Sequence, residues 1–164
     1  MTLAKVLIQI IENTVTTIEE YIGDIPNPHL KDNQAKLVYD AEDECCFWQH
    51  FKVLSEKQTK NLIDQISLYF SIRSPSINFN GHIYGIAYAT SDLIVLPFPY
   101  SKSVPYICHE MAHVINYQDE TMADHHGANF SGTYLNIVKE FIGLEAYKEL
   151  NNSFDTLGVR YNLN

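Results

Sequence analysis

The sequence SVPYICHEMAHVINYQ, residues 103–118, contains the motif H-E-x-x-H at residues 109–113. Residues four apart lie on one face of an α-helix, so His109 and His113 can bind one metal ion together. Glu110 projects beside them and can hold and deprotonate a metal-bound water. The pattern therefore predicts a zinc site on a helix.

The residues around the motif favour the helix that this chemistry requires. Ser103 is a candidate N-cap, and Pro105 fits the first helical turn, where its missing N–H costs nothing. The segment also has an apolar face for core packing, made of Ile107, Met111, Val114 and Ile115.

A catalytic zinc takes three protein ligands and keeps a fourth position open, so a third ligand is expected downstream. Four of the seven histidines lie between residues 109 and 126. We predict His126 as this ligand, because Gly127 directly after it lets the backbone turn tightly into the next helix. An acidic residue here that does not bind metal can orient an imidazole instead. The alternatives that remain open are His125, Asp124, Asp119 and Glu120.

Length and composition indicate one ordinary globular domain. The chain has 164 residues, of which 46% are hydrophobic and 19% charged. It carries 20 acidic and 11 basic residues, for a net charge of −9. A protein that binds duplex nucleic acid or an anionic membrane needs a basic surface. Both kinds of partner are therefore disfavoured.

The cysteines and the N-terminus favour a cytoplasmic protein. There are three cysteines and no C-x-x-C pair, which is typical of reduced thiols rather than a disulfide framework or a zinc ribbon. The first residues, MTLAKVLIQIIENT, lack the pattern of a signal peptide. No stretch has the length of a membrane span.

The N-terminal third is expected to be mostly helix and loop. Apolar residues recur at helical spacing over residues 2–22, and residues 24–36 are polar and contain prolines. Residues 36–40 fit either a strand or a helix. The acidic run 42–44 is interpreted as a solvated face.

The rest of the chain alternates between helix and strand signals. Ser55 and Gln58 form a capping box, and the helix behind it is expected to end at Ser74-Pro75. Its apolar side consists of Leu62, Ile63, Ile66, Tyr69 and Phe70. Three short strands are predicted within residues 76–80, 82–89 and 93–96, as a meander or a small mixed sheet.

Helical patterns return from about residue 104 to the end, with breaks near residues 119–127 and 143. The expected fold class is α+β. A small sheet of three or four strands packs on the H-E-x-x-H helix, with helices flanking it at both ends of a single domain, residues 1–164.

The segment HGANF, residues 126–130, followed by Tyr134, completes the pattern HE-x-x-H … HG-x-x-F-x-x-x-Y. In this pattern the chain resembles the SprT-like (Spartan-related) zinc metallopeptidases, and more closely the short SprT-like metallohydrolases of bacteria and phages. The likeness extends over residues 36–161. It includes matches that are each weak: a Tyr/Glu signature at residues 37–42, a β segment at residues 85–89 and 94–97, and C-terminal segments at residues 143–146 and 157–161.

The resemblance implies a zincin-like fold, zinc ligands His109, His113 and His126, and Glu110 as general base. It also implies a cytoplasmic protein of a bacterial cell or a phage-infected host. The chain has neither the zinc ribbon nor the DNA-binding tail of larger relatives. Together with the charge of −9, this argues against a role on DNA–protein crosslinks.

The predicted function is a zinc-dependent hydrolase, a metallopeptidase that cleaves a peptide or protein substrate. Glu110 would take a proton from the zinc-bound water and pass it to the leaving amine. A second donor must stabilise the oxyanion. Tyr134 leads for this role, although it also falls where it can pack against Phe130. The other candidates are Tyr117, His82 and Arg160.

The alternative function is a non-catalytic binding or regulatory protein on a zincin scaffold. A fourth protein ligand, for example Asp124 or His125, would then close a structural zinc site. The two functions are separated by whether the zinc keeps an open position.

Overall fold

Helix α4, Val104–Gln118, carries the H-E-x-x-H motif and is buried along most of its length. Ser103 occupies the predicted N-cap position with extended backbone but makes no side-chain capping hydrogen bond, and Pro105 lies in the first turn, as predicted. A helix that is buried on all sides normally carries apolar residues. Four polar residues are nevertheless buried in α4: His109, Glu110, His113 and Asn116.

The computed structural model describes residues 34–45, 51–80, 87–97, 99–119 and 125–163. All of them belong to one compact unit, residues 31–164. The helix expected at residues 2–22 lies outside the described residues. So do most of the loop expected at residues 24–36, the candidate His82 and the alternative ligands Asp124 and Glu120.

The helices follow the predicted breaks. Alongside α4 the described residues form helices α2 (Ala35–Glu44), α3 (Glu56–Tyr69), α5 (Ala128–Phe141) and α6 (Leu144–Leu157), and the short 3₁₀ helix η2 (Tyr100–Lys102). Residues 36–40 are therefore helix rather than strand. None of these helices has the length and apolar character needed to cross a membrane.

Helix α3 begins as expected and ends early. Ser55 caps it, with both hydrogen bonds of the capping box to Gln58 in place. The helix stops at Tyr69 rather than at Ser74-Pro75, because Ser71 adopts a positive φ of 55° that takes the backbone out of the helix. Ile63 and Ile66 are buried as predicted, whereas Tyr69 is 56% exposed.

The sheet is mixed rather than a meander. Its strands are β1 (Ser76–Asn78), β2 (Tyr88–Ala89) and β3 (Leu93–Val95), in the spatial order β1-β3-β2. Strand β3 pairs in parallel with β1 and antiparallel with β2, with Ile77 opposite Ile94 and Tyr88 opposite Val95. The fold class is α+β, as predicted.

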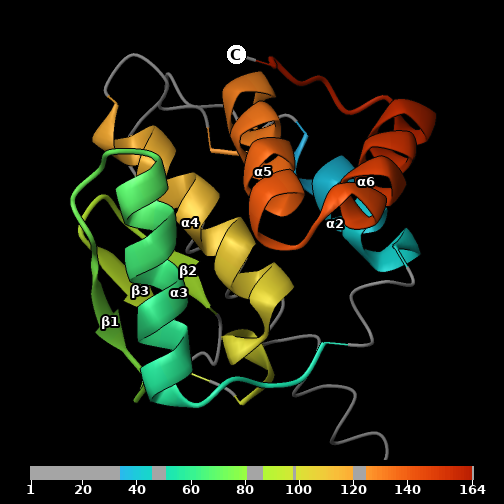
Figure 1. Cartoon of the computed structure of the whole chain (residues 1–164). Helices are drawn as coiled ribbons and strands as arrows, with labels where there is room; N and C mark the ends of the chain where they lie inside the picture. The colour runs from blue at the N-terminus through green and yellow to red at the C-terminus, as the bar shows by residue number, and fades with distance from the viewer. Residues whose placement is uncertain (1–33, 46–50, 81–86, 98, 120–124, 164) are drawn as a thin grey trace, which may run out of the picture. The chain divides into compact units, whose positions relative to one another are not determined.

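Helix α4 lies between the sheet with α3 and the helices α5, α6 and α2. It contacts β2, β3 and α3 on one side and α5 on another, while α5 and α2 both pack on α6 (Figure 1). The predicted packing of the sheet on the H-E-x-x-H helix is therefore present. The same arrangement brings α2 and the start of α5 to the motif.

Candidate metal centre

Three imidazoles converge where α4 meets the start of α5. His109 and His113 come from α4, and His126 lies two residues before the first residue of α5. Their candidate ligand atoms all lie within 4.8 Å of one another, and all three side chains are buried. Nε2 of His109 and Nε2 of His126 are 3.3 Å apart. Two nitrogen ligands of a tetrahedral zinc lie about 3.3–3.4 Å apart, so the spacing of this pair matches two ligands of one metal ion.

His126, rather than His125, belongs to this group. Gly127 is the N-cap of α5, but its φ of −72° is open to any residue, so the turn after His126 does not depend on the conformational freedom of glycine. His125 is half-buried and its Nδ1 lies 2.7 Å from the hydroxyl of Tyr117. Within the described residues, no fourth side chain joins the three histidines.

Phe130 forms the apolar support of the group. Its side chain is fully buried. The ring centroid lies 5.1 Å from His109, 4.4 Å from His113 and 4.8 Å from His126. One side chain therefore limits the movement of all three imidazoles.

Glu42 is a site residue that sequence reasoning missed. The acidic run 42–44 was expected to be a solvated face, and this is wrong for Glu42. Its Oε1 lies 2.7 Å from Nδ1 of His109, and its side chain is only 15% exposed. Asp43 is exposed, as expected. The one signal for Glu42 was its place in the Tyr/Glu signature of the family resemblance.

Burial controls the protonation of the groups on α4. It raises the pKa of Glu110 to about 7, with His109 lowering and Glu42 raising the value in smaller measure. Burial and the neighbouring histidines lower the pKa of His113 well below its usual value. His113 is therefore a neutral imidazole at pH 7, the form that binds a metal.

Glu110 Oε2 and His113 Nδ1 are among the buried polar atoms that have no hydrogen-bond partner within the described part of the chain. Each such group costs about 1–3 kcal/mol when it is left unsatisfied. Native structures tolerate this cost mostly where a ligand, an ion or a water completes the site. Thr59 and Ser67 on α3 also have such atoms, so the two atoms of the motif support a binding site only together with the three converging imidazoles.

The charges near the group favour a cation. Glu42 and Glu110 supply two carboxylates beside three imidazoles, while every lysine and arginine in the described ranges is exposed or half-buried. Nitrogen ligands from three histidines suit zinc better than calcium or magnesium, which prefer oxygen. The donor set and the charge therefore both fit Zn²⁺.

The four candidates for the second donor lie in different places. Tyr134 is fully buried, and its pKa lies well above the usual value because of burial and then the Glu42 carboxylate. Tyr117 is half-buried, and its ring is parallel to that of His113. Arg160 is exposed and lies near the C-terminus. His82 lies outside the described residues.

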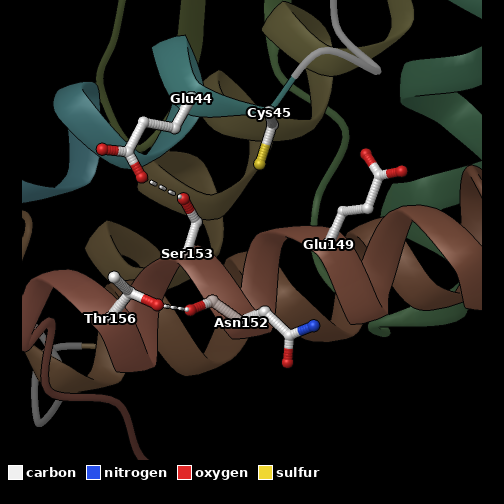
Figure 2. Close-up of a pocket in the computed structure, with 6 residues that line it drawn as sticks. All are labelled: Glu44, Cys45, Glu149, Asn152, Ser153 and Thr156. Carbon is white, nitrogen blue, oxygen red and sulfur yellow. Dashed lines mark hydrogen bonds between the residues drawn. The ribbon is translucent and has the colours of Figure 1, made fainter.

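A hollow lies between the end of α2 and α6 (Figure 2), and none of the three histidines lines it. It is lined by Glu44, Cys45, Glu149, Asn152, Ser153 and Thr156. Ser153 donates a hydrogen bond to Glu44 across it, and burial raises the pKa of Cys45 to about 11. Cys45 is therefore a thiol rather than a nucleophilic thiolate at neutral pH.

Comparison with known proteins adds no relative: no protein-family model, curated protein or solved structure matches this chain. The SprT-like resemblance and the zincin fold therefore stay predictions. They rest on the H-E-x-x-H and H-G-x-x-F residues themselves.

Proposed function

We propose that this chain is a zinc-dependent hydrolase, and specifically a metallopeptidase, built around His109, His113 and His126. The observation that carries the proposal is the convergence of these three buried imidazoles, with the buried carboxylate of Glu110 on the same helix. Three protein ligands leave a position open for water and substrate, as catalytic zinc sites require.

When bound, Zn²⁺ would polarise a scissile carbonyl and lower the pKa of water toward neutrality. Glu110 is the proposed general base. Burial raises its pKa to about 7, and a cation bound beside it would lower that value and favour the carboxylate form that accepts a proton. Its unpartnered Oε2 leaves an acceptor available for a water molecule or for the substrate amine.

Tyr117 is the best-placed hydroxyl for the oxyanion. It follows His113 by one helical turn, and the two rings are stacked at 5.7 Å with an interplanar angle of 14°. His125 Nδ1 lies 2.7 Å from the Tyr117 hydroxyl and orients it. Tyr134 is the weaker candidate, because its side chain is fully buried and lies near the Glu42 carboxylate.

The proposal is tested by metal content and then by activity. Purified wild type should hold one zinc per chain by mass spectrometry. His126→Ala should lose it, and the matched neighbour variant His125→Ala should keep it. Glu110→Gln should keep zinc and lose cleavage of a fluorogenic peptide library.

Each other outcome has a clear meaning. A wild type without metal after zinc reconstitution would overturn the proposal. Loss of zinc in both histidine variants would indicate a closed four-ligand site and favour the non-catalytic alternative. Peptide cleavage that persists in Glu110→Gln would remove Glu110 from its proposed role.

A further inference from the structure

We infer that Glu42 is a positioning residue of the metal centre, which holds His109 in the tautomer and orientation that direct Nε2 at the metal. The inference rests on the proposed function, because it assigns a role toward the metal that His109 would bind. It concerns a residue 67 positions away from His109 in the chain.

The first evidence is the direction of the contact. Glu42 Oε1 lies 2.7 Å from Nδ1 of His109, while Nε2 of the same ring points to His126. An imidazole that donates from Nδ1 to a carboxylate carries its free lone pair on Nε2. The carboxylate therefore selects the tautomer that has a ligand atom on the side of the three-histidine group.

The second evidence is that α2 presents a second side chain to the same ring. Tyr39 lies three residues before Glu42, on the same face of α2. Its ring stacks on His109 with centroids 5.7 Å apart and an angle of 14°, and it meets the edge of His126 at 5.0 Å. Two contacts from one helical face fix the plane of His109 as well as its tautomer.

The third evidence is the setting of the Glu42 carboxylate. The side chain is 15% exposed, and that of His109 is 7% exposed, so the contact is shielded from solvent. Across the described residues, the ion pairs of lysine with an acid lie within a single helix, on exposed side chains. The pair of Glu42 with His109 instead joins α2 to α4 at the candidate metal centre.

The expected consequence is stronger metal binding. A carboxylate behind a ligating histidine raises the basicity of the imidazole and removes the freedom of the ring to rotate. Loss of such a partner typically costs about 10- to 100-fold in metal affinity or activity. Tyr39 is 48% exposed and remains in place in a Glu42 variant, so the ring retains part of its support.

The experiment compares Glu42→Ala and Glu42→Gln with Asp43→Asn. Asp43 is the matched control, because it is the next residue of α2, is acidic and is exposed. Zinc affinity is measured by competition with a chromophoric chelator, and the visible spectrum of the Co²⁺-loaded protein reports the ligand geometry. Circular dichroism of each metal-free variant checks the fold.

We expect Glu42→Ala to bind zinc about 10- to 100-fold more weakly than wild type. The zinc affinity of Glu42→Gln should lie between those of wild type and Glu42→Ala. Its amide oxygen still accepts a hydrogen bond from His109 Nδ1 but carries no charge. Asp43→Asn should match wild type in affinity and Co²⁺ spectrum. If Glu42→Ala fails to fold, the comparison of Glu42→Gln with Asp43→Asn decides.

The failures are distinguishable. Equal zinc affinity and equal Co²⁺ spectra in the Glu42 variants and Asp43→Asn would overturn the positioning role and leave the proposed hydrolase standing. A wild type that binds neither zinc nor Co²⁺ would overturn both. Weaker binding in all three variants would point to a general charge effect and would also reject the specific role.

Discussion

The ring of Phe130 lies against the ring of His113, with 4.4 Å between centroids, and it also contacts His109 and His126. A single apolar side chain from α5 thus supports three imidazoles from two segments. This relationship connects the stability of the fold to the geometry of the candidate metal centre.

Replacing Phe130 with alanine should therefore lower both the folding stability and the zinc affinity. Phe→Ala at a fully buried site costs about 3–5 kcal/mol of folding free energy. The cavity also lets the imidazoles turn, so zinc affinity should fall further than in Phe130→Leu, which refills most of the volume. Urea unfolding of the metal-free protein and chelator competition measure the two effects. Unchanged zinc affinity in Phe130→Ala would show that the ring does not hold the ligands.

Gly132 is the place where α5 meets the C-terminal strap, residues 159–163. A Cβ at Gly132 would lie 1.7 Å from the backbone oxygen of Asn162. This clash can be relieved only if the backbone of residues 159–163 moves. Asn162 also donates from its backbone to Ala128, at 2.9 Å. Gly132→Ala should destabilise the protein by about 1–3 kcal/mol and increase amide exchange in the strap.

Truncation after Tyr161 provides the control, because it removes the atoms that Cβ would meet. In the truncated chain, Gly132→Ala should be neutral or stabilising by up to about 1 kcal/mol, since alanine favours a helix over glycine. A double-mutant cycle by urea unfolding measures the difference. An equal cost of Gly132→Ala in both backgrounds would mean that Asn162 is not the obstacle.

Stability should fall at alkaline pH because of Cys108. Full burial raises the pKa of this thiol well above its ordinary value of 9.0. In the unfolded chain the thiol ionises near pH 9, whereas the folded chain keeps it protonated. The contribution is complete below about pH 9 and is lost as pH rises. The expected loss from pH 7 to pH 9.5 is about 1 kcal/mol for this group.

The contribution of Cys108 is measured by urea unfolding of wild type and Cys108→Ala at pH 7 and pH 9.5. Both proteins are kept reduced and free of metal. The variant is expected to be less stable at pH 7 and to lose less on going to pH 9.5. Parallel losses in the two proteins would show that Cys108 ionises as readily in the folded state as in the unfolded one.

Tyr117 should matter for turnover rather than for metal binding. Tyr117→Phe keeps the ring stacked on His113 and removes only the hydroxyl. If that hydroxyl stabilises the oxyanion, kcat should fall about 10²- to 10³-fold with KM and zinc content little changed. Tyr106→Phe, at an exposed position of the same helix, is the control. A loss in Tyr134→Phe and none in Tyr117→Phe would return the role to Tyr134.

Local sequence was sufficient for the helices that carry the site. The i, i+4 spacing of His109 and His113, the Ser55 capping box and the break before Gly127 depend on residues within one or two turns. Their geometry therefore follows from backbone physics alone. His126 was predicted over His125 because a glycine follows it, although Gly127 adopts a φ of −72° that other residues also adopt.

The tertiary structure decided the contacts between segments that are distant in the chain. Glu42 reads as part of a solvated acidic run, and only the packing of α2 places it 2.7 Å from His109. The order β1-β3-β2 and the burial of Tyr134 likewise depend on which elements meet. Periodicity predicts which face of a helix is buried, but not which helix will cover it. The sequence therefore predicted the three histidines of the candidate metal centre, and the packing of α2 and α5 determined which side chains surround them.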